Sequence, residues 1–327
     1  MVITRPLAID RTVTLTINGS TQRVRMCADR AGLPPLLIVQ AGPGLPVLHE
    51  VPKFQRHLNL ERHFLVNYWE QRGCGVASRE DAARVSLRRQ VDDLRAVVRW
   101  LHKETHQTSV LFGISVGATM ALRAAADQLD HARAVIAISP DAQTKMSDAC
   151  VYTFLEDQCT RNGSRRLRRR VTKLGTPPYV DAAALRRRAA LLADLGTIER
   201  GATFSTLLRQ MLFSLVRTYG VVGTTRALRN MNIVQRTLMP ELVLLNLIAN
   251  PPNVAIPVHY VFGERDALTP ASFVTQLPRA VAAPGSTVTY LRDAGHMAHF
   301  DQPEVVRSIA IKAIGAAYPS RVSARAM

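Results

Sequence analysis

The segment Gly113-Ile114-Ser115-Val116-Gly117 constrains the fold of this chain more than any other feature. It joins an apolar run, residues 110–112, to an alanine-rich helical stretch that continues to about Leu129. A serine in so tight a strand-to-helix turn must adopt a strained backbone, and side chains two residues before and after it would collide, so only glycine fits there. The sequence therefore predicts a turn that holds the Ser115 hydroxyl above the carboxyl end of a sheet. The alternative is a tight turn whose serine only caps the helix.

Short apolar runs and helical patterns alternate through most of the chain. Residues 12–17 alternate in polarity and end at Asn18-Gly19, a strong hairpin signal. Val91, Leu94 and Val98 recur at helical spacing between two of the apolar runs. This order predicts an α/β fold with a mostly parallel central sheet flanked by helices. The predicted strands are residues 12–17, 22–27, 35–40, 64–69, 110–112, 134–138, 257–262 and 287–291.

The strand rhythm stops near residue 140 and resumes near residue 257. The intervening residues are helical in pattern and rich in arginine, which predicts a helical cap inserted after the sixth strand. We therefore expect a discontinuous core, residues 1–140 and 251–327, and a cap of residues 141–250. Apolar runs in the cap at 207–208, 211–213 and 242–245 are expected to face the core or to line the substrate pocket.

Composition fits a globular protein that needs no metal or cofactor. The chain has 327 residues, of which 47% are hydrophobic, and no run of about 18 apolar residues that could span a membrane. The four cysteines form no CxxC pair, and His102 and His106 have no third ligand at useful spacing. Together with the lack of an apolar leader, this predicts free thiols in a cytoplasmic protein with no membrane partner.

The charge is strongly positive, with 42 Lys+Arg against 25 Asp+Glu and a net charge of +17. Arginines are spread over the whole chain, although the cap holds 17 Lys+Arg against 8 Asp+Glu. We interpret the clusters at 165–170 and 186–188 as solvated helix faces and expect no nucleic-acid partner. A polyanion-binding protein is kept as the non-enzyme alternative.

A nucleophilic serine needs a base, and the base needs an acid that orients it. Asp266 and His296 each follow one of the last two predicted strands, in the chain order that this type of fold requires. We therefore predict Ser115 as nucleophile, His296 as general base and then acid, and Asp266 as the carboxylate that fixes the imidazole. Asp293 is the rival acid and His299 the rival base.

Backbone N–H groups must also hold the oxyanion of a tetrahedral intermediate. Val116 can supply one from the start of the helix, and Gly42, with Ala41 beside it, is expected to supply the other from the loop after the first core strand. The pocket and its loops are expected to include Gln40, Pro43, Gly44, Glu70, Gln71 and Arg72.

These motifs resemble those of an α/β-hydrolase of the proline iminopeptidase-like group. That group carries HGGPG, DQRGxGxS, GxSxG, GxxD and GH blocks. The corresponding blocks here are QAGPG at 40–44, EQRGCGVAS at 70–78, GISVG at 113–117, GERD at 263–266 and GHMAHFDQPE at 295–304. The blocks span the two core pieces, about two thirds of the chain. The resemblance implies the α/β-hydrolase fold and a Ser-Asp-His triad that works without a cofactor.

Three departures from the group concern the substrate. Gln40 replaces the loop histidine, and Val116 replaces the tryptophan that usually follows the nucleophile. The cap lacks the Glu-Asn-His-Tyr-type stretch with which true iminopeptidases hold the free amine of their substrate. Activity as a proline-specific exopeptidase is therefore not expected.

The leading hypothesis is a metal-free serine hydrolase that cleaves an ester, lactone or amide through an acyl-enzyme. Its substrate is expected to be a largely apolar small molecule or short peptide. Alternatives are a proline iminopeptidase-type aminopeptidase, and an acyltransferase or C–C hydrolase on the same triad. The oligomeric state is left open.

Overall fold

The computed structural model describes residues 7–126 and 129–315. Its centre is an eight-stranded sheet with the order β1-β2-β4-β3-β5-β6-β7-β8, in which β2 is antiparallel to both of its neighbours and the other pairs are parallel. The strands are β1 Ile9–Ile17, β2 Ser20–Ala28, β3 Pro35–Val39, β4 Leu65–Glu70, β5 Ser109–Ile114, β6 Ala132–Ile138, β7 Val258–Gly263 and β8 Thr287–Leu291. All eight predicted strands are present, so the predicted mostly parallel sheet is confirmed.

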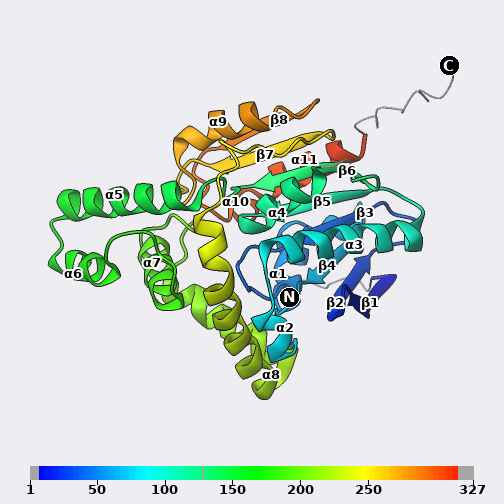
Figure 1. Cartoon of the computed structure of the whole chain (residues 1–327), viewed down its shortest axis with the longest axis horizontal. Helices are drawn as coiled ribbons and strands as arrows, with labels where there is room; N and C mark the ends of the chain where they lie inside the picture. Colours follow the sequence, from blue (N-terminus) through cyan, green and yellow to red (C-terminus); the bar gives the residue numbers. More distant parts are fainter. Residues whose placement is uncertain (1–6, 127–128, 316–327) are drawn as a thin grey trace.

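Helices flank the sheet on both faces (Figure 1). They are α1 Val51–His57, α2 Arg79–Ala83, α3 Leu87–Thr105, α4 Val116–Ala125, α5 Thr144–Asn162, α6 Arg165–Leu174, α7 Ala182–Asp194, α8 Phe204–Val243, α9 Ala271–Val281, α10 Ala298–Asp301 and α11 Pro303–Gly315, with a 3-10 turn η1 at Leu60–Arg62. The sequence predicts a terminal helix that begins at Pro303, and α11 begins there. The expected end of that helix, near residue 317, lies outside the described part of the chain.

Alternation along the strands divides the core into two apolar layers. Leu111 of β5 belongs to the apolar cluster that includes side chains of α3, α4 and α9, whereas its neighbour Phe112 belongs to the cluster that includes those of α1, α10 and α11. Successive side chains of a strand point to opposite faces, so a strand covered on both faces must be apolar throughout. This explains why the central strands read as continuous apolar runs.

The alanine-rich stretch ends as a helix earlier than expected. We predicted helix to about Leu129, but α4 ends at Ala125. Ala126 is extended, with ψ 158°, and forms an isolated antiparallel bridge with Val254. A pairing with a segment about 130 residues away therefore overrides the local helical preference of alanine.

Helices α5 to α8 follow β6 and precede β7, where the sequence predicts a cap (Figure 1). The exact bounds of this unit, residues 141–250, remain a proposal. Helix α8 bends at Gly220, which has a φ of 68° and a non-helical ψ. The arginines 165, 166, 168, 169, 186 and 187 are exposed, as expected for solvated helix faces.

The expectation that the apolar runs of the cap face the core or the pocket is wrong for several residues. Phe213 is 69% exposed and Leu244 is 85% exposed, and Leu212 also faces solvent. Helix α8 buries only one stripe, which includes Leu215, Val234 and Leu238. Phe213, Leu212 and Leu244 lie outside that stripe, and no element of the described chain covers them.

Two further findings concern the described residues as a whole. Within residues 7–126 and 129–315, no helix combines the length and the apolar character needed to cross a bilayer. The four cysteines are free thiols, and three of them are buried.

Asp93 of α3 ties the β1–β2 hairpin to the centre of the molecule. Its carboxylate is fully buried and accepts hydrogen bonds from Arg72, at 2.8 and 3.0 Å, and from Gln22 and Asn18. Arg72 itself lies after β4 and also donates to the carbonyl oxygens of Ile17 and Asn18. One carboxylate therefore holds together three separate segments of the chain.

We predict that Asp93→Ala lowers the free energy of unfolding by about 3–5 kcal/mol, because it removes both short hydrogen bonds of the buried Arg72 guanidinium and leaves it only the more distant carboxylate of Asp81, 3.8 Å away. Urea unfolding followed by circular dichroism would measure the change. The neighbouring Asp92→Ala is the control, since Asp92 is half exposed and its pairs with Arg88 and Arg95 should contribute at most about 1 kcal/mol. Equal effects of the two changes would contradict the prediction.

Candidate active site

Ser115 sits at the turn between β5 and α4 with φ 54° and ψ −124°, a conformation that is strained for any residue other than glycine. Its N–H donates to the carbonyl oxygen of Ile138 at the end of β6. In the described structure, the Ser115 hydroxyl makes no capping hydrogen bond to α4. The alternative of a serine that only caps the helix is therefore wrong.

The two glycines of the motif are required, although the obstacle is backbone rather than side chain. A Cβ on Gly113 would lie 2.5 Å from the Cα of Ala118. A Cβ on Gly117 would lie 2.5 Å from the carbonyl oxygen of Gln40 at the end of β3. Real Cβ atoms do not approach so closely, so α4 can start against β3 and β5 only with glycine at both positions.

His296 and Asp266, 30 residues apart in sequence, meet at the ends of β7 and β8. The Nδ1 atom of His296 lies 2.9 Å from Oδ2 of Asp266, and both side chains are buried. Oδ1 of Asp266 accepts from the N–H groups of Leu268 and Thr269, so the whole carboxylate is held in place.

The electrostatics of this pair favour an ionised aspartate. Burial raises the pKa of Asp266, but the charge of His296 and the hydrogen bonds from His296 and Thr269 outweigh it and set the pKa below its ordinary value. An ionised Asp266 keeps the imidazole proton on Nδ1 and leaves Nε2 free to accept a proton.

Close backbone packing explains the glycines of the GERD and GH motifs. A Cβ on Gly263 would lie 2.5 Å from the carbonyl oxygen of Ala294. A Cβ on Gly295 would lie 2.7 Å from the carbonyl oxygens of Thr197 and Ile198, which belong to the predicted cap. Those two carbonyls also accept from the N–H groups of His296 and Met297, at 2.9 and 2.8 Å. The loop that carries His296 is thus hydrogen-bonded to the cap.

The rival residues are placed differently. His299 is 1% exposed in α10 and stacks on Phe54 with ring centroids 5.5 Å apart. Burial lowers the pKa of His299 well below its ordinary value, so it is a neutral packing residue. Asp293 is exposed and has a φ of 59°. The carboxylate that contacts the imidazole of His296 is that of Asp266.

The loop after β3 lies beside the start of α4. A Cβ on Gly42 would be 3.9 Å from Cβ of Val116, so the backbones of these two residues border the same space. Ala41 next to them is buried. Two predicted oxyanion donors therefore lie close together, on either side of the Ser115 elbow.

The other loop residues connect the site to its surroundings. The Gln40 side chain turns away to donate to Glu50 at the start of α1, and its carbonyl oxygen accepts from Gln71 at 3.4 Å. Gly44 has φ 79°, and a Cβ there would touch Val234 and Met231 of α8. The segment that contains Pro43 is therefore enclosed between the core and α8.

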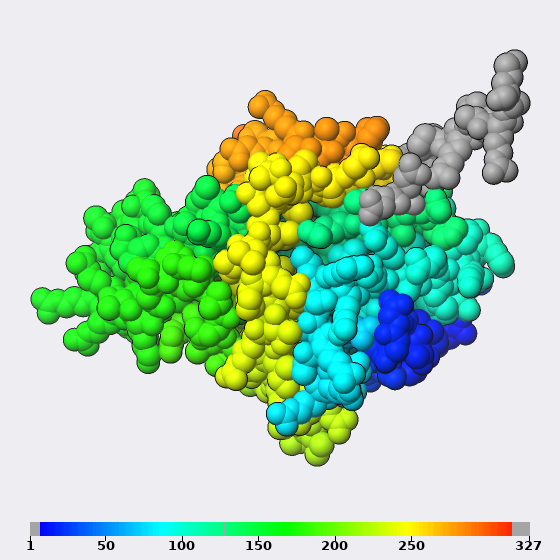
Figure 2. Space-filling model, in the orientation of Figure 1, coloured from blue at the N-terminus to red at the C-terminus, as the bar shows by residue number. Residues whose placement is uncertain are grey.

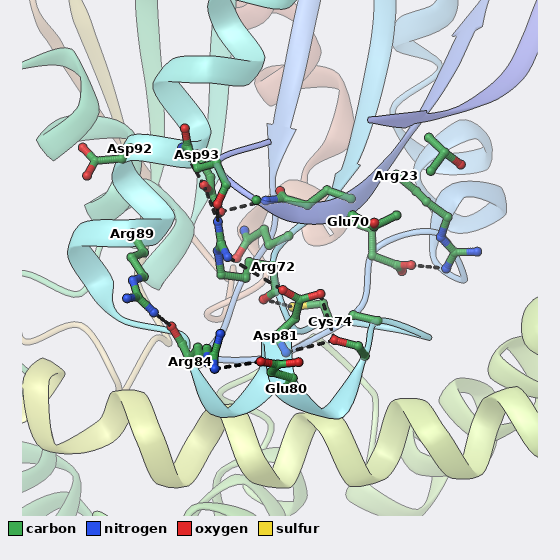
Figure 3. A pocket seen from close by; sticks show the side chains of 18 of the residues that line it. Arg23, Glu70, Arg72, Cys74, Glu80, Asp81, Arg84, Arg89, Asp92 and Asp93 are labelled. Carbon is green, nitrogen blue, oxygen red and sulfur yellow. Dashed lines mark hydrogen bonds and ion pairs between the residues drawn. The ribbon is translucent and has the colours of Figure 1, made fainter. Parts of the chain in front are cut away.

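Glu70, Gln71 and Arg72 line a polar cavity of about 1170 Å³ that contains none of the three predicted triad side chains (Figure 3). Glu70 is bound by Arg23 of β2 and by the hydroxyl of Tyr219 of α8, and Arg72 is bound by Asp93. The charged groups of this cavity are thus largely paired with one another. Size alone does not make it the reaction site, because the strained serine and the His–Asp pair lie elsewhere.

Asp141 is a residue near the site that the sequence analysis missed. Thr119, one turn after Ser115 in α4, donates to the carbonyl oxygen of Asp141 at 2.7 Å. Oδ2 of Asp141 accepts from Thr144 at 2.8 Å, whereas Oδ1 is occluded from solvent and has no hydrogen-bond partner among the described residues. The signal was available: Asp141 follows directly after the strand next to β5, at the same edge of the sheet as Ser115.

Burial raises the pKa of Asp141 from 3.8 to about 6, against the opposing effects of Thr144, Arg188 and His296. Within the described residues, no three His, Cys, Asp or Glu side chains are grouped so as to hold a metal ion. The predicted absence of a metal and of a cofactor stays a prediction.

Comparison with known proteins identifies the family. A model of the alpha/beta hydrolase family matches residues 43–309. The chain is 23% identical over 296 residues to the probable aminopeptidase YbaC of Bacillus subtilis (strain 168), covering 89% of this chain and 92% of that protein. The chain belongs to the alpha/beta hydrolase family, and the prediction that it is a hydrolase of this fold is confirmed.

Solved structures agree on the fold. The proline iminopeptidase of Mycobacterium smegmatis superposes with a TM-score of 0.63 at 16% identity, covering 94% of this chain and 100% of that one. The enol-lactonase of Burkholderia xenovorans LB400 gives a TM-score of 0.62 at 14% identity, covering 93% of this chain and 100% of that one. Proteins with different named reactions thus share this architecture, so the fold leaves the substrate open.

We predict that Asp141→Asn stabilises the protein at pH 8 and leaves it unchanged near pH 4. The folded-state pKa of Asp141 is raised, so ionisation penalises the folded state as pH rises from about 4 to about 6, and the penalty persists above that range. Differential scanning calorimetry should show a higher Tm at pH 8, by roughly 2–4 °C per kcal/mol of penalty removed. Asp293→Asn, at an exposed site, is the control. A lower Tm for Asp141→Asn at pH 8 would overturn the prediction.

Proposed function

We propose that the protein is a serine hydrolase that cleaves an ester, lactone or amide bond with Ser115, His296 and Asp266. The observation that carries the proposal is the 2.9 Å contact between His296 and the buried Asp266, at the same sheet edge as the strained Ser115 elbow. A base with an orienting acid and a serine raised on a sharp turn are the parts that acyl transfer needs.

In the proposed reaction, Oγ of Ser115 attacks the substrate carbonyl carbon while Nε2 of His296 takes the hydroxyl proton. Asp266 stabilises the imidazolium, and the N–H groups of Val116 and Gly42 bind the oxyanion. Each such donor contributes typically about 3 kcal/mol to lowering the barrier. His296 then gives its proton to the leaving alcohol or amine, and an acyl group remains on Ser115. Water, deprotonated by His296, hydrolyses this acyl-enzyme and restores the serine.

The charges of the predicted cap favour a substrate without a free ammonium group. Glu199 is paired with Lys53, and Asp148 is paired with Arg188. Glu241 accepts from the N–H of Leu87. These carboxylates are committed to structural contacts, so we infer a substrate whose acyl part is neutral or anionic and largely apolar.

Replacing the nucleophile or the base should abolish turnover. We expect Ser115→Ala and His296→Ala each to lower kcat for an activated p-nitrophenyl ester by at least about 10³-fold, because triad members act as a unit. The matched control is His299→Gln, which should retain activity within about tenfold. Circular dichroism checks that each variant is folded, and a folded Ser115→Ala with activity within tenfold of wild type would remove Ser115 from the mechanism.

A second candidate is an aminopeptidase of the proline iminopeptidase type. The name of the relative from Bacillus subtilis points to it, and so does the unpartnered Oδ1 of Asp141, which could accept a hydrogen bond from a substrate ammonium. Asp141 follows the strand adjacent to the serine elbow, so such a contact would act near the reacting bond.

We predict that a free amine brings no advantage. The measurement is kcat/KM for proline p-nitroanilide beside its N-acetylated form, and the ratio should lie within about tenfold of one. A preference above ~100-fold for the free amine would favour the aminopeptidase, since buried carboxylates left unpaired by the neutral analogue penalise its binding. Loss of that preference in Asp141→Asn, at unchanged turnover of an aliphatic p-nitrophenyl ester, would then locate the amine site.

The acyltransferase alternative needs a separate measurement. Analysis of the products formed with added alcohols or amines distinguishes transfer of the acyl group to another acceptor from hydrolysis.

A further inference from the structure

The bend of helix α8 exposes an unusual number of apolar side chains. Val222 is 78% exposed, Val221 is 72% exposed and Phe213 is 69% exposed. Val216 and Leu212 are exposed as well. We call this group, residues 212–222, the α8 apex. Scattered surface hydrophobics are ordinary, but five exposed ones within eleven residues around one bend are a concentration that calls for a partner.

The α8 apex is convex. Gly220 interrupts the helix, and the bend forms the end of the cap that projects below the core in the view of Figure 1. The space-filling view shows the same yellow-green segment protruding at the lower end of the molecule (Figure 2). Behind the apex, Gly223 packs against Val76. The exposed side chains therefore lie on the outside of a projection and do not line a groove.

The charged residues that α8 itself carries around the apex are all cations. Between Glu199 and Glu241 the sequence contains no Asp or Glu. The same stretch contains six arginines, and five of them are exposed in α8: Arg209, Arg217, Arg226, Arg229 and Arg236. Arg209 and Arg217 lie four residues on either side of Phe213, on the same side of the helix. The exposed apolar side chains are thus flanked by arginines of the same helix. The nearby carboxylates of Glu70 and Glu80 are paired with Arg23 and Arg84 and leave these arginines uncompensated by α8 itself.

This combination fits a lipid surface better than a second copy of the chain. Two copies of the apex would bring the like charges of Arg209, Arg217 and Arg226 together, and two convex projections cannot bury the area that a stable dimer needs. A bilayer is soft, so it can receive a convex apolar projection to the depth of the headgroup boundary. Arginines around such a projection reach the lipid phosphates while their stems stay in apolar surroundings.

We propose that the α8 apex binds the surface of membranes that contain anionic lipids. Phe213, Val221 and Val222 enter the boundary between headgroups and acyl chains, and Arg217 and Arg226 contact the phosphates. The expectation of no membrane partner rested on the lack of a spanning segment, and an interfacial contact needs none. This interaction is independent of the proposed reaction, because the α8 apex contains none of the triad residues.

The test uses the full-length protein and sedimentation with two kinds of vesicle, phosphatidylcholine alone and phosphatidylcholine with about 30% phosphatidylglycerol. We expect binding to the anionic vesicles that weakens as salt rises, with little binding to the neutral ones. The double variant Phe213→Ser, Val222→Ser should bind at least tenfold more weakly. Arg217→Glu should weaken binding by more than about fivefold, since it reverses one charge.

Leu244→Ser is the matched control, because Leu244 is an equally exposed apolar residue that follows the other end of α8. Its binding should equal that of wild type. Two results would overturn the proposal. One is no binding to anionic vesicles at low salt, or equal binding by the double variant. The other is a dimer in light scattering that the double variant abolishes, which would assign the α8 apex to a second copy of the chain.

Discussion

The contact on which the site depends is the approach of the start of α4 to the end of β3. At Gly117 the helix backbone comes so close to the carbonyl of Gln40 that no side chain could intervene. That approach fixes where α4 begins and therefore where Ser115 is held. It also brings the backbone of Val116 next to that of Gly42. The proposed nucleophile and the proposed oxyanion donors are thus positioned by one backbone contact rather than by a set of side-chain interactions.

Much of the architecture could be predicted because it is encoded locally. Buried parallel strands must be apolar on both faces, so runs such as those of β3 and β5 are visible in the sequence. The Gly-rich turns after them, read with the chain order of Asp266 and His296, were enough to pair two residues that lie 2.9 Å apart. Asp293 and His299 could be set aside for the same local reasons, and the structure places one in solvent and the other in a packed aromatic cluster.

What could not be predicted depends on contacts between distant segments. The end of α4 is set by a bridge from Ala126 to Val254. Arg72 was expected beside the pocket because of its motif, but Asp93 and the hairpin carbonyls bind it. The exposure of Phe213 depends on which stripe of α8 finds a neighbour. Apolar and polar residues are spread around all sides of α8, so its sequence carries no signal of that choice. Asp141 was overlooked because a single aspartate after a strand becomes meaningful only when its neighbours are known.

The hydrogen bonds between the 197–198 segment and the His296 loop limit how a substrate can enter. The carbonyl oxygens of Thr197 and Ile198 accept hydrogen bonds from the backbone N–H groups of His296 itself and of Met297. If helices α5 to α8 swung away from the core as one rigid lid, these bonds would break and His296, the proposed base, would lose its support with every opening. Entry without that loss requires the 197–198 segment to stay with the core while other helices move. The 197–198 segment would then remain a fixed support for the His296 loop, and a different part of helices α5 to α8 would move to admit the substrate.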